Sequence, residues 1–333
     1  MRKIVFLIMA TFLWAGNMIT IAEYNVQNLF DLKTSGNEYE EYIPFGSSNW
    51  NYKTYNIKLK HTARVIKDLN ADIIALCEIE SIDALKDLRK TLQQMGVYYK
   101  YFGIANRKNT TVKVAYLSKL KPVYKKEIWV GRNTKYRNIL EVKFDDFYLF
   151  INHWKSKSGA ESNRIKSAKA LKHRLKEIGY DKNFIITGDF NSDYEENIKF
   201  KRRRKLNNTH GITGINDILK TSFVKLKAKD ARLKNDELYN LWYDLDEDER
   251  WNYIHRGNKE NLDSMIISKP VLERGRFDYV YESFNVLRKK YLFYKRGTRI
   301  SSWYIKYRKN SKRHMGIGYS DHLPIFARFY TVK

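Results

Sequence analysis

Short apolar runs alternate along the chain with segments in which apolar residues recur at helical spacing. This alternation predicts a sheet-centred α/β architecture, because strands and helices of this kind bury one face against a common core. The runs predicted as strands are Met18–Tyr24, Ile73–Cys77, Lys113–Leu117, Asn138–Phe144, Phe147–Asn152, Phe184–Thr187, Met265–Ser268 and Ile325–Tyr330.

Two helices are predicted between these strands. The first follows Ser81, whose hydroxyl suits the N-cap position, and ends at Gly96, with leucines at helical spacing in between. The second covers Arg164–Glu177 and carries its apolar residues on one face.

The sequence predicts a single domain over residues 17–333, since no fixed-period repeat or low-complexity linker divides it. The most polar stretch, residues 194–250, contains the runs KFKRRRK and DLDEDER. We expect it to be an insertion of surface loops and short helices rather than a second domain.

Residues 1–16 read MRKIVFLIMATFLWAG, and two cations, Arg2 and Lys3, precede an apolar run. This order predicts a signal peptide; a buried first strand is the alternative. The run is shorter than the roughly 20 residues that span a bilayer. Cys77 is the only cysteine, so no intramolecular disulfide can form. We expect a secreted or periplasmic bacterial protein, monomeric and without a membrane span after signal removal.

The formal net charge of the 333 residues is +26. An excess of cations on this scale favours a polyanionic partner, with nucleic acid as the first candidate. The alternative is a surface of scattered, solvated charges, because net charge alone locates no binding site.

Five short polar motifs each lie at the end of an apolar strand, where an open sheet presents catalytic groups, and a sixth motif, at Asp263, is weaker. Taken singly, an acid after a strand is more often an N-cap or turn former, and a lone histidine is more often a hydrogen-bonded structural residue. Together and in this order they indicate an active site. They are Asn25 in AEYNVQNLFD, Glu78 in IIALCEIE, His153 in LFINHWKSK, Asp189 and Asn191 in FIITGDFNSD, Asp263 in ENLDSMIIS, and Asp321 with His322 in GYSDHLPIF.

Hydrolysis of a phosphodiester accounts for these residue types. A hard cation such as Mg²⁺ prefers one or two carboxylates plus water and phosphate oxygens, and Glu78 suits that role. Mn²⁺ or Ca²⁺ would satisfy the same ligands. An attacking water needs a carboxylate beside a hydrogen-bonding amide, which Asp189 and Asn191 supply.

The phosphate itself needs a proton donor or a cationic contact, which His153 and His322 can provide. A buried Asp263 can fix the tautomer of His322 by accepting its other ring N–H.

These motifs resemble those of the endonuclease/exonuclease/phosphatase superfamily, from about Ile19 to Phe329. Runs such as NVQNLFD, NHWKSKSG, ELYNLWYDL and GYSDHLPI are most similar to its bacterial secreted branch. The resemblance implies a four-layer α/β sandwich, two mostly antiparallel sheets face to face with helices outside. For the site it implies Glu78 as principal metal ligand with Asn25 and Asp321 close to the metal, Asp189 and Asn191 around the attacking water, His153 on the phosphate, and Asp263 paired with His322.

Two positions depart from the family pattern. Cys77 stands where a glutamine often precedes the glutamate, and Ser264 stands where a histidine often follows the aspartate. Neither removes a group with an expected catalytic role.

Candidate substrate contacts are basic residues near the motifs. Arg137 and Arg164 stand where the resembled family tends to be basic, and an ordinary surface charge is an equal alternative for each. The segment Leu287–His314 interleaves cations with aromatics, a composition typical of nucleic-acid grooves, although a hairpin with solvated charges has the same composition. The predicted contacts are Arg137, Lys155, Arg164, Arg296, Arg299 and Lys306.

The sequence therefore predicts a magnesium-dependent secreted endonuclease acting on DNA or RNA, with no stable protein partner. One alternative is hydrolysis of lipid head groups or small phosphate esters, because one catalytic core serves all these substrates in the superfamily. The other is a polyanion-binding protein without catalysis.

Overall fold

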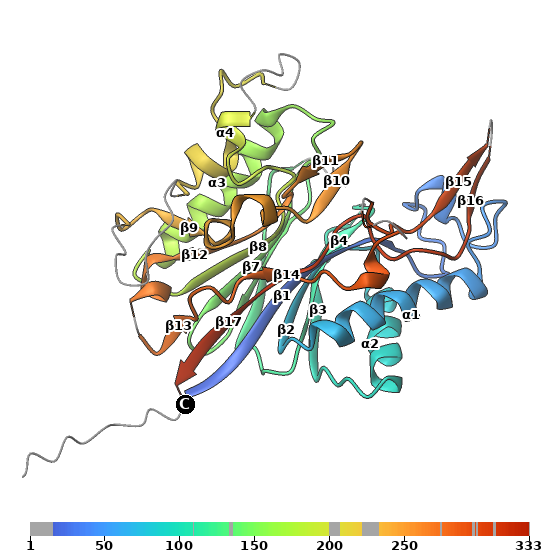
Figure 1. Ribbon diagram of the computed structural model, residues 1–333, viewed down its shortest axis with the longest axis horizontal. Helices are drawn as coiled ribbons and strands as arrows, with labels where there is room; N and C mark the ends of the chain where they lie inside the picture. Colours follow the sequence, from blue (N-terminus) through green and yellow to red (C-terminus); the bar gives the residue numbers. More distant parts are fainter. Residues whose placement is uncertain are drawn as a thin grey trace, which may run out of the picture.

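Two β-sheets lie at the centre of the computed structural model of the protein (Figure 1). The structure describes residues 16–108, 110–132, 136–199, 207–221, 233–273, 275–294, 297, 299–308 and 311–332. The predicted signal peptide lies outside these residues except for Gly16, and Arg296 also lies outside them.

The first sheet pairs the beginning of the described chain with its end. Only β1 and β2 run parallel among its described pairs. Their register sets Asn25 beside Cys77, which brings Asn25 close to Glu78. In spatial order the strands are β13 (Phe277–Tyr279), β17 (Ile325–Val332), β1 (Gly16–Leu29), β2 (Ile73–Ile79), β4 (Lys113–Ser118) and β3 (Tyr101–Ile104), with β14 (Asn285–Val286) also on β17.

The second sheet also has one parallel pair among its described strands, β7 with β8. Its register sets His153 beside Asp189 and Asp189 beside Asp263, so three of the motifs lie in one row across the sheet. In spatial order the strands are β5 (Tyr124–Ile128), β6 (Ile139–Lys143), β7 (Tyr148–His153), β8 (Phe184–Asp189), β12 (Asp263–Ser268) and β9 (Leu238–Asn240).

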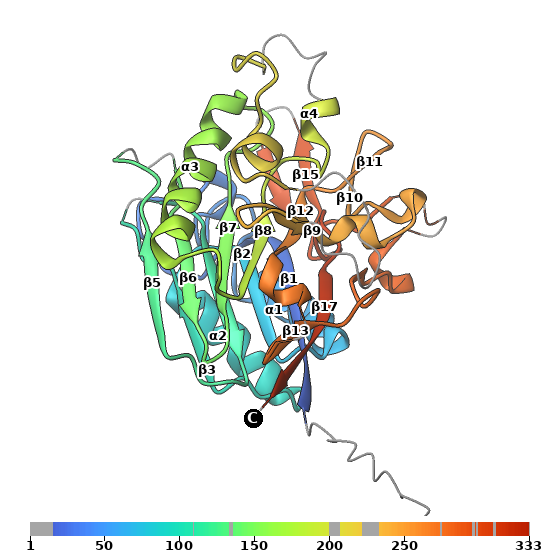
Figure 2. The same cartoon turned by 90° about the vertical axis from the view of Figure 1, so that its left-hand side faces the viewer.

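Helices cover the outer faces of both sheets (Figures 1 and 2). α1 (Tyr52–Leu69) and α2 (Ile82–Gln94) pack beside the first sheet, and α3 (Glu161–Ile178) lies on the second. Ser81 caps α2 as predicted, because its hydroxyl accepts the N–H of Ala84 at 2.9 Å. The order helix, sheet, sheet, helix confirms the four-layer sandwich.

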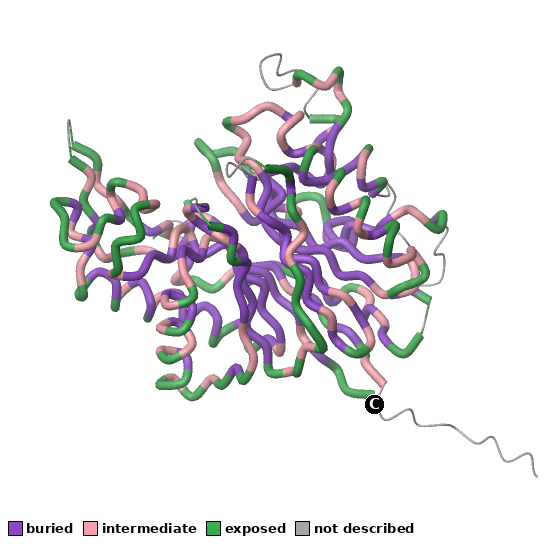
Figure 3. Tube along the Cα trace, turned by 180° about the vertical axis from the view of Figure 1, so that it is seen from behind, coloured by how far each residue is buried: buried purple, intermediate pink, exposed green. Residues whose placement is uncertain are grey.

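The inner faces of the sheets form the main apolar core, drawn in purple at the centre of Figure 3. Fully buried Ile21 and Leu76 of the first sheet belong to the same cluster as Ile185 and Met265 of the second. A smaller cluster lies under α3. Within the described residues, the helices lack the combination of length and apolar character that crossing a bilayer requires.

Short elements and hairpins lie around the two sheets and the three long helices. The region expected as a peripheral insertion, 194–250, contributes β9 to the second sheet and buries Trp242, so that expectation is corrected for its C-terminal part. The remaining described elements are the turns η1 (Glu40–Tyr42), α4 (Glu196–Lys199), η3 (Gly214–Ile218), η4 (Leu241–Asp244), η5 (Glu247–Glu249), η6 (Lys269–Leu272) and η7 (Lys290–Leu292), and the hairpins β10 (Tyr253–His255) with β11 (Asn258–Glu260) and β15 (Ile305–Arg308) with β16 (Ser311–His314).

Candidate active site

The polar motifs converge on one edge of the sandwich, opposite the edge where the chain ends (Figure 1). They come from the ends of β1, β2, β7 and β8, the start of β12 and the loop before β17. This convergence follows from the topology. β1 and β2 are parallel, so they end side by side, and the same holds for β7 and β8. The hydrogen bond from Asn25 to Asp189 joins the ends of the two pairs.

Glu78 lies near the end of β2 with its side chain partly exposed. Its backbone has φ of +67°, a left-handed conformation that a glutamate rarely adopts and that is found at functional sites. Its Oε2 accepts the N–H of Asn28 at 2.9 Å, and its Oε1 accepts from Asn25 Nδ2 at 3.3 Å. Burial and the nearby Asp321 carboxylate raise the pKa of Glu78.

Asp189 faces Glu78 from the other sheet. Asn25 Nδ2 donates to both carboxylates, at 3.1 Å to Asp189 Oδ2, and the backbone N–H of Asn191 donates to Asp189 Oδ1 at 2.8 Å. Burial and the charge of Asp263 raise the pKa of Asp189 to about 7. A carboxylate with that pKa suits a general base at neutral pH.

His153 lies between the two carboxylates. Its Nε2 is 3.5 Å from Asp189 Oδ2 and 3.7 Å from Glu78 Oε1. Burial, with Arg137 and His322 adding positive charge, holds its pKa well below the usual value. The ring is therefore neutral at pH 7 and can donate one hydrogen bond without carrying charge.

His322 and Asp263 form a buried pair, with His322 Nδ1 2.7 Å from Asp263 Oδ2. The same carboxylate accepts a hydrogen bond from Asn252, a residue that no sequence motif indicates. Burial disfavours the imidazolium, but Asp263 and Asp321 outweigh it and raise the pKa of His322 well above its usual value. Because Nδ1 is engaged with Asp263, Nε2 on the other side of the ring remains for a substrate.

The donor set fits a hard divalent cation. Ligand atoms of Glu78, His153 and Asp189 lie within 4.8 Å of one another, and Asp321 adds a partly exposed carboxylate close to Glu78. Carboxylates gathered this closely without a neutralising charge have raised pKa values, and a cation relieves that repulsion. The carboxylate oxygens of Glu78, Asp189 and Asp321 are the kind of ligand that Mg²⁺ prefers, and they leave the neutral His153 as a hydrogen-bond donor.

A cleft of about 900 Å³ opens beside Asp321. It contains Arg299, one of the predicted substrate contacts, and Arg256 from the β10–β11 hairpin, which sequence reasoning missed. Lys306 lies apart from this cleft, on the β15–β16 hairpin with Arg308 and Arg313. The residues lining the cleft are Ile254, Arg256, Gly257, Tyr294, Arg299, Ile300, Ser302 and Asp321.

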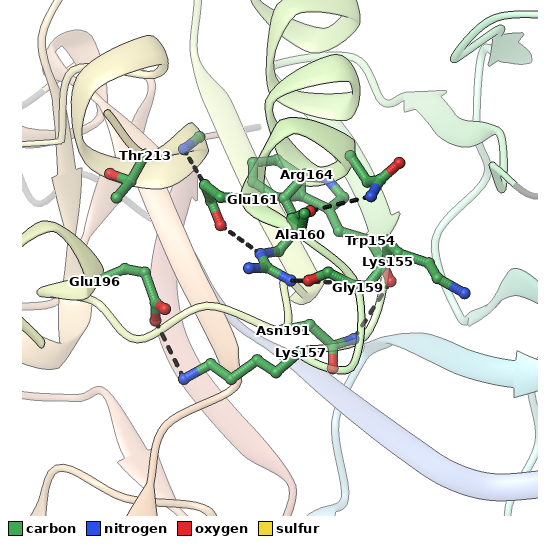
Figure 4. A network of polar contacts seen from close by, with 12 residues as sticks. Trp154, Lys155, Lys157, Gly159, Ala160, Glu161, Arg164, Asn191, Glu196 and Thr213 are labelled. Atoms are coloured by element: carbon green, nitrogen blue, oxygen red, sulfur yellow. Dashed lines mark hydrogen bonds and ion pairs between the residues drawn. The ribbon is translucent and has the colours of Figure 1, made fainter. Parts of the chain in front are cut away.

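The other predicted cations differ in their surroundings. Arg137 is half-buried next to the motifs, and its Nη1 donates to the carbonyl of Trp154 at 3.3 Å. Lys155 is half-buried, and Figure 4 shows its side chain directed away from the guanidinium of Arg164.

Arg164 is not a substrate contact, which corrects the sequence prediction. Its side chain is fully buried, and Nε donates to Glu161 Oε2 at 2.6 Å. Nη1 donates to the carbonyls of Lys155, Ser156 and Gly159, and Glu161 in turn accepts the N–H of Gly214 (Figure 4). Arg164 thus fixes the loop that follows His153.

Replacing Arg164 by methionine should destabilise the protein strongly, because Glu161 would be left as an unpaired buried charge. Breaking such a pair costs about 3–5 kcal/mol in free energy of unfolding, measurable by urea denaturation. Lys169→Met, which removes an exposed cation from the same helix, should change that free energy by less than about 0.5 kcal/mol. A stable Arg164→Met variant with a raised KM would instead restore the substrate-contact role.

The chain is similar to known proteins in sequence and in fold. A model described as "Endonuclease/Exonuclease/phosphatase family" matches residues 20–210 and 212–331. A search of curated proteins finds no match.

Similar solved structures include an AP endonuclease from Archaeoglobus fulgidus, with 14% identity, a TM-score of 0.58, and coverage of 93% of this chain and 98% of that one. TDP2 from D. rerio, complexed with single strand DNA product, has 14% identity, a TM-score of 0.55 and coverage of 94% and 98%. A mannosyl-6-phosphatase from Bacteroides thetaiotaomicron has 16% identity, a TM-score of 0.50 and coverage of 93% and 99%. At these identities the likeness shows a shared fold.

Proposed function

Because the chain belongs to the endonuclease/exonuclease/phosphatase family, we propose that it is a magnesium-dependent phosphodiesterase that cleaves nucleic acid. One observation carries the proposal: the carboxylates of Glu78 and Asp189, with His153 between them, lie at the same edge as a cleft that contains two exposed arginines, Arg256 and Arg299. Acids alone would repel a phosphate, whereas a cation site flanked by arginines attracts one.

Each residue of the site has a separate role in the proposed hydrolysis. Glu78, with Asn25 and Asp321 close by, would hold the cation, which when bound neutralises charge on the phosphate. Asp189 accepts the proton of the attacking water, and Asn191 orients that water.

The two histidines act on the phosphate. His322, kept as an imidazolium by Asp263, donates from Nε2 to a phosphate oxygen, where charge develops during in-line attack. His153, as a neutral ring, would donate a hydrogen bond from Nε2 to the phosphate and would not ligate the cation.

We also propose that the mature protein is exported, as in the bacterial secreted branch of the family. The support is the order of Arg2 and Lys3 before an apolar run, and the single cysteine, Cys77. Cell fractionation of a tagged chain would test this, and a cytoplasmic protein that keeps its N-terminus would contradict it.

A substrate panel tests the proposed function. Purified protein would be assayed on plasmid DNA, RNA, sphingomyelin, a sugar phosphate and a chromogenic diester, with Mg²⁺ and with chelator. We expect cleavage of polynucleotides that chelator abolishes. Hydrolysis of only lipid or small esters would favour that alternative, and binding of polynucleotide without hydrolysis of any substrate would favour a non-catalytic protein.

Salt dependence tests the role of the cleft arginines. Arg256→Gln with Arg299→Gln should raise the KM for polynucleotide and reduce the slope of log affinity against log salt by about 0.7–0.9 for each lost phosphate contact. Turnover of the chromogenic diester should stay unchanged. Lys306→Gln is the matched control, because Lys306 lies outside the cleft; an equal effect of Lys306→Gln would show that overall charge, not the cleft, attracts the substrate.

A further inference from the structure

A second basic cavity, of about 690 Å³, lies outside the cleft described above. Its wall combines five cations with one carboxylate and one exposed tryptophan, Trp129. The lining residues are Asn106, Arg107, Lys108, Lys125, Lys126, Glu127, Trp129 and Arg132. A cavity of this size holds a ligand as large as a nucleotide.

Strand register places this cavity on the catalytic edge. Asp263, Asp189 and His153 form one row across the second sheet. The row continues into β6 and β5. Leu140 of β6 pairs with Ile151 of β7, two residues before His153, and Ile139 of β6 pairs with Ile128 of β5, directly before Trp129. β5 is three strands from β8. Because neighbouring strands lie about 4.8 Å apart, the backbone of Trp129 is about 14 Å from that of Asp189.

Internal contacts hold the tryptophan in place. The guanidinium of buried Arg107 lies 4.8 Å from the centre of the Trp129 ring. Arg107 also donates to the carbonyls of Tyr136 and Gly131 and to Asn138 Oδ1. One side of the ring therefore rests on a fixed cation, while 64% of the residue remains exposed to solvent.

The wall has one carboxylate, Glu127, against five cations. Glu127 accepts the N–H of Asn106 at 2.7 Å and Asn138 Nδ2 at 2.9 Å, so both of its oxygens have donors. The exposed cations Lys108, Lys126 and Arg132 then set the charge of the cavity.

We propose that Trp129 is a stacking platform for a base of the polynucleotide strand, a few nucleotides from the scissile phosphate, with the surrounding cations holding the adjoining phosphates. The inference rests on the proposed nucleic-acid substrate and adds a single-stranded subsite to it. An unpaired base offers a face to the open side of the ring, whereas a base inside a duplex is already stacked.

Binding of labelled single-stranded DNA of about 16 nucleotides, in chelator to prevent cleavage, tests the platform. Trp129→Ala should weaken binding about 5- to 150-fold, which corresponds to the loss of one base stack. Trp129→Phe should recover most of the affinity. Tyr98→Ala is the matched control: Tyr98 is 65% exposed but lies before β3 at the opposite edge, and its loss should leave binding unchanged.

An oligonucleotide with abasic sites separates stacking from charge and folding. Because it keeps its phosphates but has no bases, Trp129→Ala and the unchanged protein should bind it equally. Equal weakening of both ligands, or of neither, would overturn the platform.

Failure of the platform can be told apart from failure of the proposed function. If polynucleotides are cleaved and Trp129→Ala leaves their affinity and KM unchanged, the platform is wrong and the nuclease stands. If the protein hydrolyses the chromogenic diester but no polynucleotide, the nuclease assignment is wrong. Tight capture of an acidic peptide at Trp129, with no affinity for single strands, would also overturn the platform.

Discussion

Replacing Glu78 by glutamine should lower kcat on every phosphodiester by about 10³-fold or more, since a metal ion contributes several kcal/mol of charge stabilisation in the transition state. The substitution keeps the size of the side chain, and the amide oxygen can still accept the N–H of Asn28. The loss should therefore fall on cation binding and not on the fold.

Thermal unfolding separates these two effects. In chelator the Glu78→Gln variant should melt at or above the temperature of the unchanged protein, because the substitution removes one charge from a cluster that also contains Asp189 and Asp321. Added Mg²⁺ should raise the melting temperature of the unchanged protein more than that of the variant.

Asp83→Asn provides the control, because Asp83 is a carboxylate on α2 paired with Lys33 and Lys86, away from the site. It should change neither kcat nor the response to Mg²⁺. Near-native turnover of Glu78→Gln would remove Glu78 from the cation site and leave Asp189 and Asp321 as the ligands to test next.

Strand positions could be predicted from the sequence because a buried strand is apolar throughout. The run Ile73–Cys77 predicts β2 nearly in full; the remaining residues of that strand are Ile79 and the polar Glu78, whose carboxylate accepts hydrogen bonds from Asn25 and Asn28. β5 was not predicted for the opposite reason: it is an edge strand, paired on one side only, and three of the five residues in its sequence YKKEI are charged.

α1 was not predicted from the sequence, because a polar residue on its inner face depends on long-range contacts. Its inner face contains Lys58, which interrupts the apolar stripe. Lys58 is fully buried because Nζ donates to the carbonyls of Val26 and Tyr319, which are 32 and 261 residues away. No local pattern encodes partners at that separation.

Some residues of the site could likewise be recognised in the sequence, and others could not. Motifs at strand ends could be recognised because strand ends that lie on one edge bring their side chains together, as the contacts of Asn25 with Glu78 and Asp189 illustrate. Burial of a cation leaves no mark in the sequence, so Arg164 could not be told from a surface arginine. Arg256 had no signal either, since it lies in a short hairpin of ordinary polar residues.

Asp263→Asn should lower kcat by about 10²- to 10⁴-fold, because the amide no longer supplies the charge that holds His322 as an imidazolium in one orientation. Asp263 is fully buried and 2.7 Å from His322 Nδ1, so solvent cannot replace it. KM for small diesters should change little, since Asp263 itself does not touch the substrate.

The pH dependence of the remaining activity distinguishes this role from a structural one. In the unchanged protein the pKa of His322 is raised, so the imidazolium persists through neutral pH and His322 does not limit activity there. Without Asp263 the pKa falls while burial still disfavours the charge, so activity of the variant should decline as pH rises through the mildly acidic range, and the deficit should be smallest at low pH. Asp244→Asn is the control: Asp244 is another buried aspartate, bonded to the hydroxyls of Tyr239 and Tyr279, and its loss should lower stability without moving the pH profile. A uniform loss of activity at every pH in Asp263→Asn would show that Asp263 only packs against His322, because a purely structural partner cannot shift the pH at which the ring loses its proton.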